Sequence, residues 1–490
     1  MELWAPHAIL QAVSEFPELA VKPGEYACSW FVGKESRPGQ IELNGNRLPR
    51  LDLFDDKWAD AAAGSIIHSF GQSQDVDRLV GKMRSNHDVV LVGARIDSGL
   101  PGWAFGVARF AIIGLGVDRV HEDRYERLVL QVTGADRFFG ASPVKDWSWP
   151  ARSSRRAEQR YSVLVNPDAR RRWRDRTEGM SVVCSYARQF PLHKYRFELA
   201  FAPVVEFVAD NPLTLDEWVT RWLQPLVDVA SLASGDPQRL AWLTVHSGRG
   251  REETSGVVFG GGIAQAPYRA GYDDEWRRSG RRPLFTFATL PVQLPVLLRR
   301  WRRLGSGESP FVALYRLALL DPDLPLRARY LYLIQALEAL HGHENRAKEE
   351  KAQRRFAADR EQYIVEIERL GVDPSRVKFL KANWSNRKQI SLASRLSDLV
   401  KRLPAPVRGR LQQPEMASIA SELQTEHQAT VLHEQLGVLR NDLSHGRRSY
   451  PDADLRPWVE CVDLICRAHL LRLLGFNDAA IVAAVATAGS

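Results

Sequence analysis

The sequence predicts an α+β protein of more than one domain, in which a β-rich N-terminal region is followed by an all-α helical bundle. Two observations predict this division. Up to about residue 305, short runs of β-branched and aromatic residues alternate with Gly and Asn turns. Beyond it, apolar residues recur at three- and four-residue spacing between Pro and Gly breaks. We therefore expect domains 1–305 and 306–490, and leave open a further division of the first into lobes 1–205 and 206–305.

The strands expected in the first two hundred residues are short segments bounded by turn residues such as Asn44, Gly45 and Asn46. They are 26–32, 40–43, 65–70, 89–93, 108–113, 128–132 and 195–207. A helix over 211–232 follows, because Thr214 and Glu217 have the spacing of a capping box. Further strands are expected near 240–246 and 257–259, and a helix over 291–303 connects to the C-terminal region.

The helices expected in the C-terminal region are 309–320, 325–345, 346–370, 389–402, 417–445 and 455–474. Together they predict a bundle of about 180 residues. Glu338 is the lone acid of a nearly all-apolar stretch, 330–341. A buried carboxylate needs a partner. Glu338 therefore pairs with Arg440 or another arginine of the bundle, or else it lies partly exposed, and the sequence leaves both readings open.

A group of polar residues at the end of the segment 417–445 is the pattern here that indicates catalysis. Asn441 and His445 are four residues apart and share one face of a helix, with Arg440 beside it and Gly446 as the stop. A histidine can move a proton to or from a ribose or phosphate oxygen. The planar guanidinium of Arg440 suits a phosphate that gains charge, and Asn441 could orient either partner.

The spacing alone is a weak signal, because Arg188 and His193 repeat it by chance. That second match contains Pro191 and lies between extended segments, so no helix can present it. The Arg440 match instead continues an apolar stripe made of Leu432, Leu436, Leu439 and Leu443. The competing interpretation is a plain helix end, with a solvated arginine and a histidine favoured by the helix dipole.

These residues resemble the HEPN domain of the ApeA family of anti-phage abortive-infection proteins. The resemblance covers roughly residues 310–478. It rests on the stretch Gln-Ala-Leu-Glu-Ala-Leu-His at 335–341, on the Leu-Arg-Asn motif with His445 and Gly446, and on the amphipathic helix over 456–474. The segments Trp-Phe-Val-Gly, Gly-Gln-Ile-Glu-Leu and Gly-Ser-Ile-Ile before residue 70 are loosely similar to the ApeA N-terminal domain.

The resemblance implies a toxic endoribonuclease that needs neither a metal nor a cofactor. It would cleave host RNA, tRNA being one candidate, and leave 2′,3′-cyclic phosphate and 5′-OH ends. Arg440, Asn441 and His445 would be its catalytic residues and Glu338 a supporting one. Members of the family are expected to form a homodimer through the motif helices, and a higher oligomer stays open. An unknown phage trigger would release the activity, which the N-terminal region otherwise restrains.

One departure from related HEPN toxins is informative. Those paired with a nucleotidyltransferase often carry a tyrosine two residues after the histidine, where this chain has Arg447. The nearest tyrosine is Tyr450, so silencing by modification at that position is not expected. Arg447 and Arg448 are instead expected to extend a phosphate-binding rim, unless they belong to a solvated loop.

The composition narrows the class of protein. The net charge of +8 is compatible with RNA binding but does not require it. Four scattered cysteines exclude a disulfide framework, and no paired His or Cys pattern indicates a zinc site. Neither a signal peptide nor an apolar run of about 18 residues occurs, so we expect a cytoplasmic protein that is not in a membrane.

Two other functions remain open. The bundle could be a non-catalytic HEPN-like module that binds RNA or dimerises. Alternatively, the 14 tryptophans could indicate a carbohydrate- or peptide-binding β-domain with a helical appendix. Exposure of Trp4, Trp147 and Trp149 is the simple check of that reading. The sequence identifies neither the RNA substrate nor the phage trigger.

Overall fold

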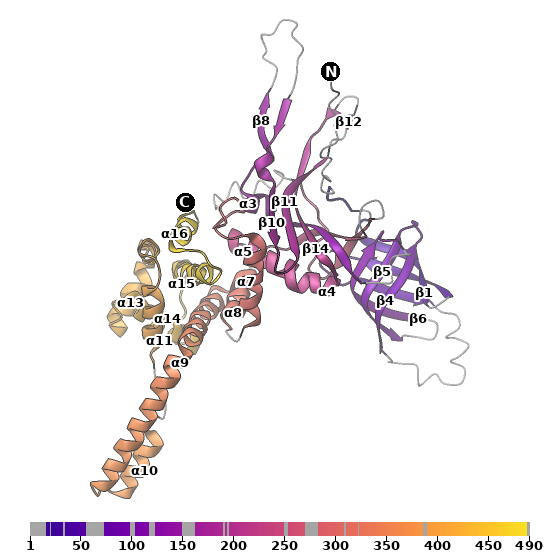
Figure 1. The fold of residues 1–490 in the computed structure, drawn as a ribbon. Coiled ribbons are helices and arrows are strands. Elements are labelled where there is room, and N and C mark those ends of the chain that lie inside the picture. The colour runs from indigo at the N-terminus through magenta and orange to yellow at the C-terminus, as the bar shows by residue number, and fades with distance from the viewer. Residues whose placement is uncertain are drawn as a thin grey trace, which may run out of the picture. The chain divides into compact units, whose positions relative to one another are not determined.

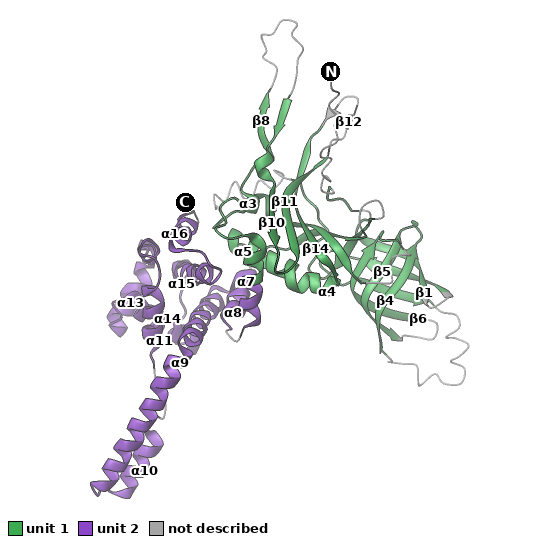
Figure 2. Ribbon diagram, viewed as in Figure 1, with its two compact units in different colours: residues 1–299, 487–490 green, residues 300–486 purple. Residues whose placement is uncertain are grey.

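The structure is a computed structural model of the 490-residue chain. It divides into two compact units, residues 1–299 with 487–490 and residues 300–486 (Figure 2). The predicted α+β organisation is confirmed, because strands dominate the first unit and helices the second (Figure 1). The residues described are 16–19, 21–32, 35–54, 73–98, 103–116, 123–148, 162–189, 192–193, 196–248, 253–269, 283–307, 310–321, 323–385, 390–487.

Twelve strands of the described part of unit 1 form one antiparallel sheet in the order β10-β11-β14-β7-β15-β16-β6-β3-β2-β1-β4-β5. Because β5 also pairs with β6, the last six strands close into a barrel. The barrel strands are β1 (Gly24–Val32), β2 (Glu35–Leu43), β3 (Arg50–Phe54), β4 (Ser73–Met83), β5 (Asp88–Ser98) and β6 (Trp103–Ile113). The others are β7 (Tyr125–Val132), β10 (Arg171–Asp175), β11 (Met180–Gln189), β14 (Ala200–Leu213), β15 (Leu240–Ser247) and β16 (Thr254–Gly260).

The barrel core is built around Trp30, whose side chain is fully buried. Its indole nitrogen donates a hydrogen bond to the backbone oxygen of Asp52 at 3.1 Å. Gly39 and Gly81 flank the ring, and a Cβ at either would lie 2.6 Å from an indole atom. Only glycine therefore fits at these two strand positions.

Smaller elements complete unit 1. Two strand pairs lie outside the large sheet, β8 (Val144–Ser148) with β9 (Ser162–Val165) and β12 (Leu192–His193) with β13 (Arg196–Phe197). The short helices are α3 (Ala135–Phe139) and η3 (Pro167–Ala169). The predicted helix near 211–232 is present as α4 (Leu215–Trp218), a π-helical turn η4 (Val219–Leu223) and α5 (Gln224–Ser234).

The capping box at the start of this helix is confirmed. The Thr214 hydroxyl accepts from the Glu217 backbone N–H at 3.2 Å, and the Glu217 carboxylate accepts from the Thr214 N–H at 2.9 Å. Trp218 and Trp222 place their rings 6.3 and 6.0 Å from that of Phe207 on β14. The helix therefore packs on the sheet.

The strands predicted near 26–32, 40–43, 89–93, 108–113, 128–132, 240–246 and 257–259 are confirmed, and β14 confirms most of 195–207. The predicted strand 65–70 lies outside the described residues. Strands β3, β4, β8, β9, β10 and β11 were not predicted. The second Arg–His spacing, at Arg188 and His193, lies on β11 and β12, as its extended flanks predicted.

Unit 2 is a helical bundle entered through α7 (Leu294–Ser306), within which the division between the units falls. Buried aromatic side chains at its core are Tyr315, Tyr330 and Trp458. Its other elements are α8 (Phe311–Leu320), α9 (Leu326–Arg369), α10 (Pro374–Asn383), α11 (Leu392–Lys401), α12 (Ala405–Arg408), η6 (Pro414–Met416), α13 (Ala417–His427), α14 (Leu432–His445), α15 (Asp452–Leu473) and α16 (Asp478–Thr487).

Two predicted helix boundaries are wrong. The segments 325–345 and 346–370 form the single 44-residue helix α9, whose outer part lies beside α10 (Figure 1). The segment 417–445 is instead two helices, because Gln428 adopts a left-handed conformation with φ 55° at the end of α13. Left-handed backbone is uncommon outside glycine, so nothing in the sequence marked this break.

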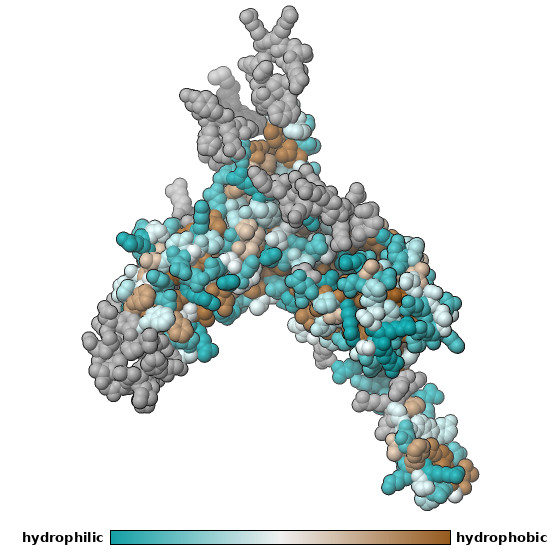
Figure 3. All heavy atoms as spheres, turned by 180° about the vertical axis from the view of Figure 1, so that it is seen from behind, coloured by the Kyte–Doolittle hydropathy of each residue, from teal (hydrophilic) through white to brown (hydrophobic). Residues whose placement is uncertain are grey.

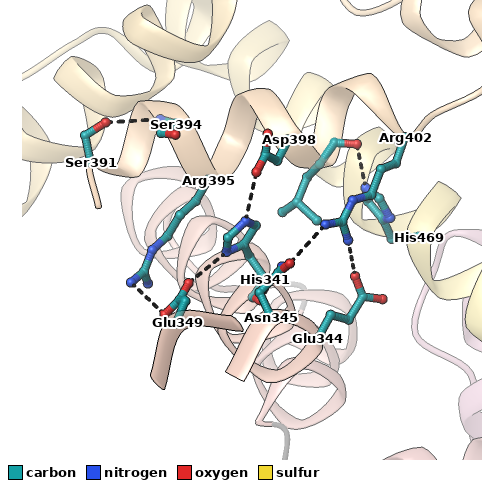
Figure 4. Close-up of polar contacts among 11 residues, drawn as sticks. His341, Glu344, Asn345, Glu349, Ser391, Ser394, Arg395, Asp398, Arg402 and His469 are labelled. Atoms are coloured by element: carbon teal, nitrogen blue, oxygen red, sulfur yellow. Dashed lines mark hydrogen bonds and ion pairs between the residues drawn. The ribbon is translucent and has the colours of Figure 1, made fainter. Parts of the chain in front are cut away.

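A polar network ties α9 to α11 inside the bundle (Figure 4). His341 is buried, and its ring nitrogens lie 3.4 Å from the carboxylates of Glu349 on its own helix and Asp398 on α11. Arg395 approaches the other oxygen of Glu349 at 3.6 Å. These contacts of His341 and Arg395 join α11 to α9.

A second part of this network links α9 to α11 and α15 (Figure 4). Arg402 and Arg472 both contact Glu344, at 2.6 and 2.9 Å. His469 of α15 is buried with its Nε2 3.1 Å from the Leu399 carbonyl oxygen, so Nε2 carries the hydrogen. Burial lowers the pKa of His469 to about 3, and the ring is therefore neutral.

Candidate active site

The helix that carries the predicted catalytic residues is α14. Its apolar side is buried in the bundle through Leu432, Leu436, Leu439 and Leu443. This orientation leaves Asn441 and His445 exposed. The helix ends at Gly446, which is left-handed with φ 64° and donates its N–H to the Asp442 carbonyl. The predicted helix stop is confirmed, and His445 lies in the last turn.

Arg440 lies beside these exposed side chains and is half-buried. Its Nη2 is 3.8 Å from Oε2 of Glu338 on α9, and its Nη1 donates to the Asn441 amide oxygen at 3.2 Å. The two readings of Glu338 both hold, since its carboxylate pairs with Arg440 while the side chain stays 26 % exposed. The structure thus brings Glu338, Arg440 and Asn441 together.

Side chains of α9 also donate hydrogen bonds to backbone carbonyl oxygens of α14. The Tyr330 hydroxyl donates to the Leu436 carbonyl oxygen at 2.9 Å in the bundle interior. Arg327 donates to the carbonyl of Leu443, in the last turn, where carbonyls have no partner within the helix. Burial raises the pKa of Tyr330 well above its usual value, so the hydroxyl remains a donor. Neither contact was predicted, because both join residues more than a hundred positions apart.

A buried carboxylate lies on the flank of the motif. Asp442 is 3 % exposed, and its Oδ2 accepts a hydrogen bond from the Tyr450 hydroxyl at 3.2 Å. Nε2 of His427, the last residue of α13, is 4.0 Å from the same oxygen. Burial, with a smaller contribution from Asp442, raises the pKa of Tyr450. Sequence reasoning missed Asp442 and His427, whose side chains meet only through the packing of α13 on α14.

The two arginines after the motif differ in their surroundings. Arg447 is exposed and makes no ion pair with the residues that the structure describes. Arg448 binds two carboxylates of α13, Glu422 at 3.0 Å and Glu426. This double pairing anchors the loop after α14 to α13.

Metal-binding groups or reactive cysteines among the described residues would indicate other kinds of site. Within the described ranges, no group of three or more His, Cys, Asp or Glu side chains could hold a metal ion. The four cysteines, all described, are buried free thiols, and burial raises the pKa of Cys28 and Cys461 to about 12. Such thiols are poor nucleophiles and poor metal ligands at neutral pH.

The visible surface is mostly hydrophilic, with separate apolar places (Figure 3). Trp147 on β8 is 63 % exposed, whereas Trp4 and Trp149 lie outside the described residues. Trp103 on β6 is also exposed, at 40 %, and two exposed tryptophans on separate strands do not define a carbohydrate site. Among the described helices, none combines the length and apolar character that a bilayer crossing requires.

Two models of known protein families match this chain. A family model described as ApeA N-terminal domain 1 matches residues 25–301, more than half of the chain. The chain belongs to the ApeA family. A second model, Apea-like HEPN, matches residues 331–480 and includes the whole of α14. No curated protein and no solved structure matches the chain.

The two matches confirm the resemblance on both sides of residue 305. ApeA membership places the chain among anti-phage defence proteins, and its bundle is a HEPN module of the nuclease type. The HEPN match contains Glu338, Arg440, Asn441 and His445. It also contains Asp442 and His427, while Arg327 lies just before it.

Proposed function

We propose that this ApeA protein defends against phage by cleaving host RNA inside the infected cell, with Arg440, Asn441 and His445 as catalytic residues. The observation that supports this most is the exposed end of α14. An arginine, an amide and a histidine lie there on a helix whose other side is fixed in the bundle. A helix end without a chemical role has no need of the three together.

In the proposed reaction, the ribose 2′-OH loses its proton to a histidine such as His445, and its oxygen attacks the adjacent phosphorus. The bond from phosphorus to the 5′-oxygen breaks, and that oxygen takes up a proton. The products carry a 2′,3′-cyclic phosphate and a 5′-OH. The guanidinium of Arg440 stabilises the added negative charge on the phosphate, so no metal ion is required.

Glu338 and Asn441 support the guanidinium in this proposal. Both contact Arg440, and together they limit the orientations of its side chain. Arg447, exposed beside His445, is suited to hold an adjacent RNA phosphate. We leave Arg448 out of the RNA contacts, because Glu422 and Glu426 already bind it.

We further propose a homodimer in which the exposed sides of two α14 helices face one cleft. A composite site would supply two arginines and two histidines. Larger assemblies remain compatible with such a pair. Exposed loops of tRNA offer unstacked nucleotides and make it one candidate substrate. The β-rich unit would restrain the nuclease until a phage component binds it.

The test is incubation of wild type and His445→Ala with total bacterial RNA in EDTA, followed by analysis of the fragment ends. The proposal expects fragments with cyclic phosphates from wild type alone. Equal cleavage by both proteins would contradict the assignment of His445. If neither cleaves, even after addition of extract from infected cells, the alternative of a non-catalytic HEPN-like module that binds RNA or dimerises is favoured.

A further inference from the structure

The proposed reaction requires two proton transfers at opposite ends of the scissile bond. The attacking 2′-oxygen loses a proton while the departing 5′-oxygen gains one, and the two oxygens lie on opposite sides of the phosphorus. One imidazole cannot serve both oxygens at the same moment. His445 is the only histidine of the predicted motif. A second proton-transfer group must therefore come from another copy or from elsewhere in the chain.

His427 is a histidine near the motif that sequence reasoning missed. It is the last residue of α13, its side chain is 37 % exposed, and its Nε2 lies 4.0 Å from Oδ2 of Asp442. Asp442 and His445 are three residues apart on α14, which separates them by about 60° around the helix axis. His427 thus contacts the last turn of α14 at Asp442, one helical turn before the position of His445.

The end of α13 is held firmly at this place. Glu426, directly before His427, and Glu422, one turn earlier on α13, both bind Arg448 in the loop after α14. Tyr450, at the end of the same loop, donates to Asp442. Arg448 therefore ties α13 to the loop after α14, and Tyr450 ties the same loop to Asp442 in the last turn of α14.

A purely structural ion pair explains this arrangement poorly. Tyr450 already supplies a hydrogen bond to the buried Asp442 carboxylate, so Asp442 does not depend on His427. A separation of 4.0 Å is too long for a hydrogen bond. An ion pair with one partner this exposed stabilises a fold by about 0–1 kcal/mol. What the contact does provide is an exposed imidazole held within 4.0 Å of a buried carboxylate.

We propose that His427 is a second proton-transfer residue of the nuclease site and that Asp442 is its positioning residue. This inference rests on the proposed function. One of the two rings, His427 or His445, is neutral and accepts the 2′-OH proton as the bond from O2′ to phosphorus forms. The other is protonated and donates to O5′ as the bond from phosphorus to O5′ breaks. One chain then holds both rings.

The test is the pH dependence of cleavage by the full chain, with an oligonucleotide that spans the site cut in bacterial RNA. Wild type should show a bell-shaped profile. His427→Ala should lower the rate about 10²- to 10⁴-fold and lose one limb. The exposed His343 of α9 provides the matched control, and His343→Ala should keep both limbs. His427→Ala with the wild-type rate and profile would overturn the proposal.

Two further measurements separate chemistry from structure. Free imidazole should restore part of the His427→Ala activity, which a structural defect would not allow. A substrate whose 5′-bridging oxygen is replaced by sulfur has a leaving group that needs no proton. If His427→Ala cleaves that substrate at the wild-type rate, His427 is the acid that protonates the departing 5′-oxygen. If only imidazole restores cleavage, His427 is the base that takes the 2′-OH proton. Rescue by neither would contradict the proposal.

The role of Asp442 is tested by Asp442→Asn, which keeps an oxygen for Tyr450 but removes the charge. The proposal expects a lower kcat with little change in KM, and a shift of the pH limb that His427→Ala removes. An unchanged profile would contradict the positioning role. If the proposed nuclease function itself is wrong, the result is different: wild type would leave RNA intact at every pH, with and without infected-cell extract.

Discussion

Glu338 of α9 and Arg440 of α14 are joined by an ion pair of 3.8 Å at the edge of the candidate site. The residues are far apart in the sequence, and each side chain is partly exposed. The carboxylate places a negative charge beside the guanidinium that is proposed to meet a phosphate. It therefore orients Arg440 while opposing the approach of RNA.

Replacing Glu338 should separate these two effects. In a His445→Ala background, Glu338→Gln is expected to tighten RNA binding about two- to fivefold, because a negative charge near the bound phosphate is removed. Stability should change by less than about 1 kcal/mol, as for other exposed pairs. Fluorescence anisotropy with labelled RNA measures the affinity. Glu361→Gln, an exposed carboxylate on the outer part of α9, is the control. Weaker binding by Glu338→Gln would show that orientation outweighs repulsion.

The hydrogen bond from Tyr330 to the Leu436 carbonyl gives a prediction about stability. Tyr330→Phe removes one hydrogen bond from that oxygen at a cost of about 0.5–1.5 kcal/mol, because the carbonyl keeps its bond within α14. Because the bond joins α9 to α14, the loss should appear in the unfolding of the helical unit, followed by urea denaturation. Tyr332→Phe, on the same helix and less buried, should change stability by less than about 0.5 kcal/mol. Equal effects of the two variants would contradict a specific role of the hydroxyl.

Much of the fold could be predicted from the sequence, and the exceptions have physical causes. Strands such as β1 and β7 carry apolar runs of their own. By contrast, β4 and β10 are rich in exposed charged residues and are held by pairing with β5 and β11. Each is the polar partner in a hairpin with a more apolar strand, so its strand state depends on that pairing, which the pattern of the polar strand does not reveal by itself. Helix α9 runs on because Gly342 alone does not end a helix.

The candidate site divides in the same way. Arg440, Asn441 and His445 belong to one helix, so their spacing alone predicted a shared surface. The contacts of Arg327 with Leu443 and of His427 with Asp442 arise where separate helices pack. Arg448 was expected to extend a phosphate-binding rim or to lie in a solvated loop, and its pairing with Glu422 and Glu426 could not be predicted because it depends on the fold of α13.

Two glycines in unit 2 should respond in opposite ways to alanine. Gly446 is left-handed with φ 64°, so Gly446→Ala costs about 1–2 kcal/mol in the backbone, although its Cβ would meet only Arg327 at 3.7 Å. Gly342 lies inside α9 with nothing within 4 Å of a Cβ, so Gly342→Ala should stabilise by about 0.5–1 kcal/mol. Thermal unfolding measures both. Shifts of the same sign would contradict the left-handed helix end at Gly446.

The buried His469 predicts a dependence of stability on pH. Its folded pKa of about 3 lies below the value of about 6.5 for an unfolded chain, so the unfolded state binds the proton more readily. The contribution of neutral His469 to the free energy of unfolding is complete above pH 6.5, and it is lost progressively as the pH falls toward 3. Between pH 6.5 and pH 5 the free energy of unfolding falls by about 2 kcal/mol, since each pH unit contributes about 1.4 kcal/mol. His469→Gln keeps an N–H donor for the Leu399 carbonyl but does not titrate. Urea unfolding at pH 7 and pH 5 should therefore show a smaller loss in His469→Gln than in wild type, and equal losses would mean that His469 is not held neutral.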